Sequence, residues 1–293
     1  MNRRSWILMA VLAATWGASY LFIKVGLRDF SPGFIVFART AMAGAILLPV
    51  AARAGALGTL HGHGRDILAL AAVQVTLPFL LITFGERHVA SSLAGILVAS
   101  APIFAAGLSF LYPGAERMKG WGLAGIAVGL VGVALLFGVD LSGDTAALIG
   151  GLMVLLAGFG YALAGFELKR RLPGVPPAAV AGATMSLSAV LTLPLAVATP
   201  PHSAGPDSIA ALLALGALGT GLAFLIFYTL ISELGPGRAS LVAYLAPAFS
   251  LLYGTTLLGE PVTLGAIAGL VLILAGSYLG AQGRLPWRRP VPA

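Results

Sequence analysis

Long apolar stretches separated by short polar islands dominate this sequence. Eight stretches lack charged residues and reach the ~20 residues with which a helix crosses the hydrocarbon core of a bilayer. They cover residues 5–23, 67–85, 89–115, 120–139, 145–166, 208–232, 239–259 and 261–283. Two weaker spans follow the same logic, one over roughly 32–53, interrupted by Arg39, and one over roughly 178–198. The pattern therefore predicts ten membrane spans.

These spans are predicted to be helices, because lipid offers the backbone no hydrogen-bonding partner and the segments do not alternate as the strands of a barrel do. Composition agrees: 59% of the residues are apolar and 9% are charged, against ~45–50% and ~25% in soluble domains. The start of the chain, with Arg3 and Arg4 before an apolar stretch, resembles a signal peptide. Because that stretch has full spanning length, we expect it to be the first helix. The predicted fold class is an all-α integral membrane protein.

Basic residues recur at every second loop, which indicates orientation rather than nucleic-acid binding despite a net charge of +7. With the first residue in the cytoplasm, 13 of the 17 basic residues lie on the inner side. These are Arg3, Arg4, Arg53, Arg65, Arg117, Lys119, Lys169, Arg170, Arg171, Arg238, Arg284, Arg288 and Arg289. The outer loops hold only Arg28 and Arg87. The positive-inside rule thus predicts that both termini are cytoplasmic.

Short landmarks recur 143 to 145 positions apart, which indicates an internal repeat. The pairs are Trp16-Gly17 with Phe159-Gly160, Leu48-Pro49 with Leu193-Pro194, Ala101-Pro102 with Ala246-Pro247, Glu116 with Glu260, Gly125 with Gly269 and Gly132 with Gly276. We expect a first five-helix repeat over 1–140, a second over 145–283 and a basic cytoplasmic tail over 284–293. Five is an odd number, so the second repeat is inverted. Inverted repeats are typical of alternating-access carriers, with the substrate site between the halves near the midplane.

In these landmarks the chain resembles the drug/metabolite transporter superfamily, and within it the EamA-type branch with two five-helix repeats. The resemblance covers nearly the whole chain and extends to bacterial exporters of aromatic amino acids. The features that carry it are Trp16-Gly17, Pro102, Pro247 and the turns Gly114-Ala115-Glu116 and Gly259-Glu260. It implies a secondary transporter of the bacterial inner membrane that exports small metabolites, above all amino acids with aromatic side chains. The alternative is a multidrug exporter of lipophilic organic cations.

Aromatic residues at middle depth point to a cavity, since Trp and Tyr in membrane proteins usually sit at the interfaces. A cavity lined by rings would suit an aromatic or otherwise apolar substrate. For any single ring, packing between helices is the alternative. The expected lining residues are Trp16, Tyr20, Phe79, Tyr161, Tyr244 and Phe224, with Ser19, Gln74, Ser100 and Thr220 as polar contacts.

Prolines inside the predicted spans are expected to act as hinges. Pro102 and Pro247 fall near the centres of the fourth and ninth spans, and Pro78 falls in the third. A proline removes one backbone hydrogen bond and clashes with the preceding turn, so that the helix kinks. A static bend is the alternative. Pro78 has no counterpart in the eighth span, where residues 219–221 (Gly-Thr-Gly) could supply the flexibility.

Three charged residues lie within the spans or at their edges near the outer face: Lys24, Arg39 and Glu86. Each charge inside a span costs several kcal/mol (~2.5–3.5 on insertion scales), so each needs a reason. Together they could form an ionic outer gate or a vestibule that attracts carboxylates. Snorkelling of Lys24 and Arg39 towards the interface is the alternative.

Nothing in the sequence indicates an enzyme. The four histidines, at 61, 63, 88 and 202, fall in loops or at span edges, and no zinc-protease motif, phosphate-binding loop or cysteine is present. We therefore expect no metal, no cofactor and no nucleic-acid partner. The expected partners are a small-molecule substrate and the lipid bilayer, with one chain working as a monomer. No carboxylate falls near a span centre, so facilitated diffusion stays open beside proton coupling.

Overall fold

The structure is a computed structural model that describes residues 3–112, 121–141, 143–201 and 203–282. Every regular element in these ranges is helical. Eight helical segments are long and apolar enough to cross a membrane, and two shorter apolar helices complete the set. The prediction of an all-α membrane protein with ten spans is therefore confirmed.

The first five spans are built from nine helical elements. They are α1 (Arg3–Gly26), α2 (Pro32–Arg53), η1 (Ala56–Leu60), α3 (Gly64–Leu70), η2 (Ala71–Thr76), α4 (Leu77–Gly85), α5 (Ser91–Val98), α6 (Ala101–Leu108) and α7 (Trp121–Val139). The third span consists of α3, η2 and α4, and the fourth of α5 and α6.

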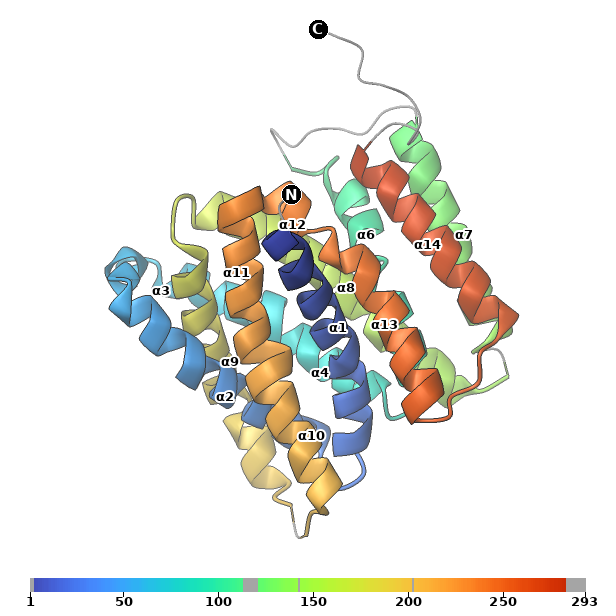
Figure 1. Cartoon of the computed structure of the whole chain (residues 1–293), viewed down its shortest axis with the longest axis horizontal. Coiled ribbons are helices and arrows are strands. Elements are labelled where there is room, and N and C mark those ends of the chain that lie inside the picture. Colours follow the sequence, from blue (N-terminus) through green and yellow to red (C-terminus); the bar gives the residue numbers. More distant parts are fainter. Residues whose placement is uncertain (1–2, 113–120, 142, 202, 283–293) are drawn as a thin grey trace, which may run out of the picture.

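The second five spans follow the same order with fewer breaks. They are α8 (Thr145–Arg171), α9 (Pro177–Ala198), α10 (Pro206–Gly216), η3 (Ala217–Leu222), α11 (Ala223–Leu234), α12 (Pro236–Ala239), α13 (Val242–Leu257) and α14 (Leu264–Gln282). Figure 1 shows α1 and α8 running in opposite directions, as inversion of the second half requires. We call the end that carries the turn 27–31 the outer end, and the end where α1 begins and α14 finishes the inner end.

Contacts between the halves organise the bundle. α2 packs along α9 at one side, and α7 packs along α14 at the other (Figure 1). Between these pairs, α1 contacts α10, α11 and α13 of the second half, while α8 contacts α4, α5 and α6 of the first. The first and sixth spans thus each pack against helices of the other half.

Close helix contacts depend on glycine. A methyl group at Gly125 of α7 would lie 2.6 Å from the amide nitrogen of Gly280 and 2.7 Å from the carbonyl oxygen of Gly276, both on α14. At Gly17 of α1 it would lie 2.5 Å from Cβ of Phe249 on α13. Glycines at these positions let the backbones approach as in other membrane helix pairs.

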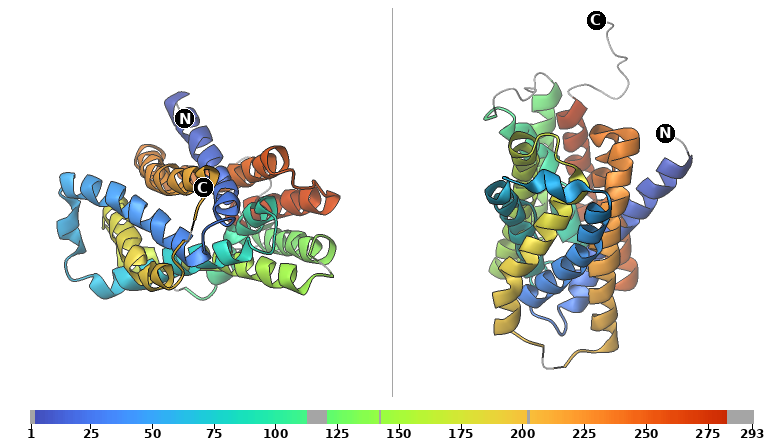
Figure 2. Two further views of the ribbon diagram at one scale, coloured as in Figure 1. Left: turned by 90° about the horizontal axis from the view of Figure 1, so that it is seen from below. Right: turned by 90° about the vertical axis from the view of Figure 1, so that its left-hand side faces the viewer.

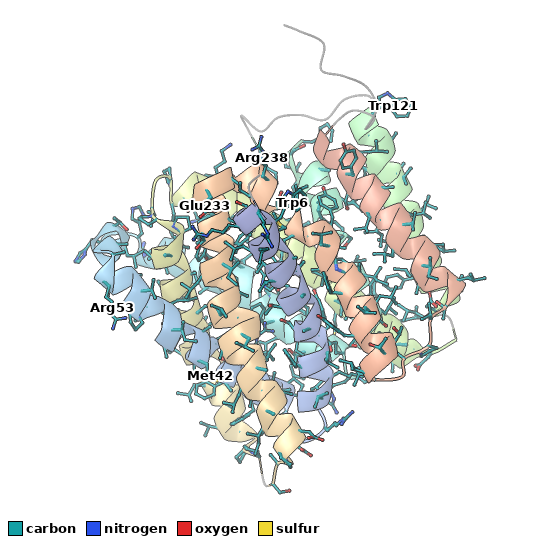
Figure 3. All side chains as sticks on the ribbon, viewed as in Figure 1. Trp6, Met42, Arg53, Trp121, Glu233 and Arg238 are labelled. Carbon is teal, nitrogen blue, oxygen red and sulfur yellow. The ribbon has the colours of Figure 1, made fainter. Side chains whose placement is uncertain are left out.

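The outer surface of the bundle is apolar. Leu264 is 86% exposed, and Val197 and Val190 are 68% and 66% exposed. So many exposed apolar side chains are not compatible with a water-facing surface and fit contact with lipid tails. Figure 2 shows the first turns of α1 leaning away from the other helices, and Trp6 there is 55% exposed. Figure 3 places Trp121, Glu233 and Arg238 near the inner end.

The three prolines predicted to act as hinges differ in their effect on the helix that contains them. The fourth span is interrupted at Ala99 and Ser100, and Pro102 lies in the first turn of α6. Pro247, its counterpart, lies inside α13, which is continuous from its first to its last residue. Pro78 lies in the first turn of α4, directly after the π-helical η2. The structure therefore has a break beside Pro102 and a π-helical segment before Pro78, and the hinge role of all three prolines stays a prediction.

Candidate functional site

The centre of the site is Arg39 of α2, which is 5% exposed. Its Nε and Nη2 atoms donate to Oγ1 of Thr220, at 3.3 and 3.1 Å. Thr220 belongs to η3, and its hydroxyl donates in turn to the carbonyl oxygen of Leu215, five residues earlier, at 2.9 Å. The wider turn of a π-helix gives this i−5 contact, and such turns are frequent at functional sites. The π-helical segment of the eighth span thus holds the acceptor that receives the buried guanidinium.

Aromatic rings surround this arginine. Cζ of Arg39 lies 3.8 Å from the centre of the Phe79 ring, a cation–π geometry that is worth ~2 kcal/mol or more when water is excluded. Phe79 is buried with Val36 and Met185, and Tyr161, Phe224 and Tyr228 pack against the same cluster. The structure therefore brings Arg39, Thr220, Phe79, Tyr161 and Phe224 together from both halves.

A second group of rings continues this wall along α1 and α11. The Trp16 ring lies 6.1 Å from that of Phe224 and 5.2 Å from that of Phe227, between ring centres. Phe224 in turn lies 5.9 Å from Tyr228. Phe227 and Tyr228 were not among the expected site residues. Their spacing of three and four positions from Phe224, which places all three on one helix face, is the signal that could have found them.

The other expected lining residues have different surroundings. The Tyr244 hydroxyl donates to the carbonyl oxygen of Ser277 on α14 at 3.2 Å, so it is engaged by packing between helices. Ser19 and Ser100 donate to the carbonyls of Thr15 and Leu97 in their own helices. Tyr20 packs against the largest apolar cluster, and Gln74 is a partly buried residue of η2.

The three predicted gate charges do not form ion pairs with one another in this conformation. Lys24 donates from Nζ to the carbonyl oxygens of Glu86 at 2.6 Å and Val89 at 2.8 Å, where α4 ends. A cation is favourable there because the last carbonyls of a helix carry partial negative charge. The Glu86 side chain is fully buried, and within the described ranges neither of its carboxylate oxygens has a hydrogen-bond partner. Arg39 is satisfied by Thr220 instead.

Glu260, which the sequence marked only as a repeat landmark, joins the halves at the outer end. Its two carboxylate oxygens accept from the backbone amides of Ser91 at 2.7 Å and Ser92 at 2.9 Å, at the start of α5. Ser250 of α13 donates to the Ser91 carbonyl at 3.1 Å. Burial raises the pKa of Glu260, but the hydrogen bonds from Ser92 and Ser91 outweigh burial and lower it below its ordinary value. Glu116, the paired landmark, lies outside the described residues.

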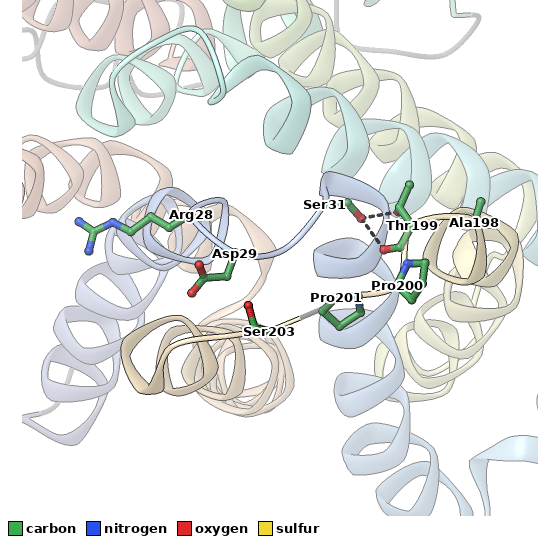
Figure 4. A pocket seen from close by; sticks show the side chains of 8 residues that line it. All are labelled: Arg28, Asp29, Ser31, Ala198, Thr199, Pro200, Pro201 and Ser203. Atoms are coloured by element: carbon green, nitrogen blue, oxygen red, sulfur yellow. Dashed lines mark hydrogen bonds between the residues drawn. The ribbon is translucent and has the colours of Figure 1, made fainter.

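The turn between α1 and α2 meets the connection between α9 and α10 at the same end. Asp29 accepts from the amide of Gly205 at 2.9 Å, and hydrogen bonds with Ser208 and Gly205 lower the pKa of Asp29. A pocket of about 550 Å³ lies between these segments (Figure 4). Its lining residues are Arg28, Asp29, Ser31, Ala198, Thr199, Pro200, Pro201 and Ser203. The pocket lies among loops, away from the buried arginine and its rings.

A second, smaller pocket of about 230 Å³ lies between the end of α1 and the end of α4. It is lined by Lys24, Leu27, Arg28, Glu86 and Arg87, three of which are basic. Glu86 thus has a buried carboxylate and also borders a pocket at the outer end.

Ten apolar spans in two inverted halves, with polar and aromatic side chains from both halves meeting inside, define a membrane transporter architecture. The sequence profile of the EamA-like transporter family matches residues 4–138 and, a second time, residues 148–281. The chain therefore belongs to the EamA-like transporter family. Its relatives in that family are transporters rather than enzymes.

Individual relatives with similar sequences are also described as transporters. The chain is 30% identical over 285 residues to the uncharacterized inner membrane transporter YedA of Escherichia coli K12, covering 90% of this chain and 88% of YedA. It is 27% identical over 303 residues to a probable amino-acid metabolite efflux pump of Escherichia coli K12, covering 99% of both. One solved crystal structure superposes with a TM-score of 0.66 at 19% identity, covering 95% of this chain and 96% of the other. At that identity the likeness concerns the fold alone.

Proposed function

We propose that this protein is a secondary transporter that exports amino acids, with a preference for aromatic ones, by alternating access between its two halves. The observation that supports it most is the buried guanidinium of Arg39 among Phe79, Tyr161 and Phe224. A guanidinium suits the carboxylate of an amino acid, and rings suit an aromatic side chain. A relative described as a probable amino-acid metabolite efflux pump is consistent with this substrate class.

The basic residues of the inner end support a placement in the cytoplasmic membrane of a bacterium with both termini inside. A tag at residue 1 and a tag in the connector 141–143 should be labelled from opposite faces of the membrane. Labelling of both from one face would remove the inverted arrangement and the alternating-access mechanism with it.

The substrate proposal is tested with the purified chain in liposomes. Flux of labelled phenylalanine should exceed flux of labelled alanine, and Trp16→Ala and Phe224→Ala should lower phenylalanine flux by roughly tenfold, since a lost aromatic contact is worth ~1 kcal/mol or more beyond its buried area. The matched controls are His61→Ala and His63→Ala, which lie in the connection between η1 and α3 and should leave flux unchanged. Equal losses in all four variants would remove this site.

Export of lipophilic cations is the second candidate, and the buried Glu86 is the observation that favours it, because an unpaired carboxylate can hold a cation. Arg39 in the same region opposes it by charge repulsion. Flux of a labelled quaternary ammonium compound without flux of phenylalanine would decide for this candidate.

A further inference from the structure

Glu86 is a buried acid whose carboxylate accepts no hydrogen bond from the described part of the chain. The side chain is fully buried, yet both carboxylate oxygens are without a hydrogen-bond partner among the described residues. An ionised carboxylate in such a place costs several kcal/mol, whereas the neutral acid costs much less. We propose that Glu86 is a proton-binding site, protonated in this conformation, that couples transport to the proton gradient.

The charged and titratable groups around Glu86 influence whether its carboxyl group is ionised. Lys24 of α1, Arg39 of α2 and Glu260 of the α13–α14 connection interact with it electrostatically, and so does Tyr20 of α1. The ammonium of Lys24 is held on the Glu86 and Val89 carbonyls rather than on the carboxylate. Burial and the Glu260 carboxylate favour the acid, whereas the two nearby cations favour the carboxylate whenever water or a substrate ammonium can solvate it.

A route for the proton lies next to the site. Glu86 borders the 230 Å³ pocket at the outer end, together with Lys24, Leu27, Arg28 and Arg87. A small rearrangement of α4 relative to α1 would connect the carboxyl group with that pocket. The proton would then pass from a hydronium ion in the pocket to a carboxylate oxygen, forming the O–H bond of the acid and leaving water. Release is the reverse reaction.

This inference rests on the proposed function only for the identity of the substrate. The sequence predicts no carboxylate near a span centre, and Glu86 follows the last helical residue of the third span. Glu86 is isolated by its complete burial rather than by depth in the span. A carboxyl group at the edge of a span can thus be as fully excluded from solvent as one at its centre.

The protonation state is tested directly by infrared spectroscopy of the full chain in lipid vesicles at pH 7.5. The wild type should show the carbonyl stretch of a protonated carboxylic acid, and Glu86→Gln should lose it. Glu233→Gln, which removes an acid at the inner end that pairs with Arg4 at 3.3 Å, is the matched control and should keep the band. Glu86→Asp retains an acid and should keep a shifted band. Identical spectra for the wild type and Glu86→Gln would overturn the assignment.

Coupling is tested in the same vesicles with labelled phenylalanine. A gradient of one pH unit is worth ~1.4 kcal/mol per proton, so one coupled proton should drive about tenfold accumulation by the wild type and by Glu233→Gln. Glu86→Gln should exchange phenylalanine across the membrane without accumulating it. Accumulation by Glu86→Gln would overturn the coupling role. If the wild type does not carry phenylalanine at all, the substrate proposal fails, and the infrared result still decides the proton site.

Discussion

The third and eighth spans are counterparts in the two halves. Both contain a π-helical segment, but different residues accompany it in each half. Each contains a six-residue π-helix, η2 at Ala71–Thr76 and η3 at Ala217–Leu222, and the two begin 146 positions apart in the chain. In the first half the π-helix precedes Pro78, whose ring cannot accept a regular preceding turn. In the second half glycines flank Thr220 and no proline follows. The same π-helical segment is therefore formed by different residues in the two halves.

The charges of Lys24, Arg39 and Glu86, in contrast, are not repeated in the second half. With the offsets of 143 to 146 positions, Lys24 corresponds to Glu167, Arg39 to Thr184 and Glu86 to Ser232. Glu167 accepts from Tyr112 at 2.7 Å and from Arg170 at 2.9 Å, and it also pairs with Arg171 at the inner end. The two halves thus share a scaffold, while among the described residues the buried arginine and the buried acid without a hydrogen-bond partner lie in the first half.

The largest effect is expected where the halves differ most in charge. Arg39→Met should lower phenylalanine flux in liposomes by roughly 10- to 100-fold, because a charge-assisted hydrogen bond is worth ~1.5–3 kcal/mol. The matched change in the second half, Thr184→Val, removes a hydroxyl that donates only to the Ala181 carbonyl of its own helix and should change flux less than threefold. Similar losses in both variants would show that the arginine has no special role in binding.

Steric tolerance should differ between the paired glycines of the first and sixth spans. A methyl group at Gly17 would lie 2.7 Å from the Ala246 carbonyl oxygen, whereas at Gly160 the nearest atom, Cγ of Pro78, is 3.1 Å away. Gly17→Ala should destabilise the protein by ~1–3 kcal/mol through overpacking, and Gly160→Ala by less. Thermal unfolding in detergent measures both, and a larger loss for Gly160→Ala would contradict the observed packing.

The outer contact of Glu260 should weaken in acid. Its pKa is lowered in the folded protein, so its stabilising contribution is fully present above the unfolded value of about 4.3 and is lost as the pH falls through the lowered folded value. Glu260→Gln should therefore lower the melting temperature near pH 7 by a few °C, and the difference from the wild type should vanish towards pH 3. Asp207→Asn, at an exposed residue in the first turn of α10, is the control and should change the melting temperature near pH 7 less than Glu260→Gln does. A constant difference for Glu260→Gln would exclude the charge as its cause.

The smallest effect is expected at Tyr244. Tyr244→Phe removes the hydrogen bond to the Ser277 carbonyl and should cost ~0.5–1.5 kcal/mol of stability while phenylalanine flux changes less than twofold. Trp16→Ala in the same assay provides the contrast. A loss of flux in Tyr244→Phe that matches Trp16→Ala would return Tyr244 to the ring-lined site.

Several features could be predicted from the sequence because they depend on local hydropathy and on spacing along the chain. The ten spans follow from the length of the apolar runs, and both Pro32–Arg53 and Pro177–Ala198, the weakest spans, are continuous helices. The repeat follows from landmarks such as Pro102 and Pro247. The expected group of Trp16, Phe79, Tyr161 and Phe224 was identifiable as rings at middle depth, since depth is a simple count from the ends of a span.

Only the tertiary structure decided which of these residues meet. Arg39 and Thr220 are 181 positions apart, and Glu260 and Ser91 are 169 apart, so no local pattern links them. The direction of the Lys24 ammonium, the engagement of Tyr244 by α14 and the isolation of Glu86 depend on which helix faces each side chain. Hydropathy determines that a segment enters the membrane, because transfer into lipid acts on each helix separately. Partner choice depends on close packing between helices, and that is specified by the whole bundle at once.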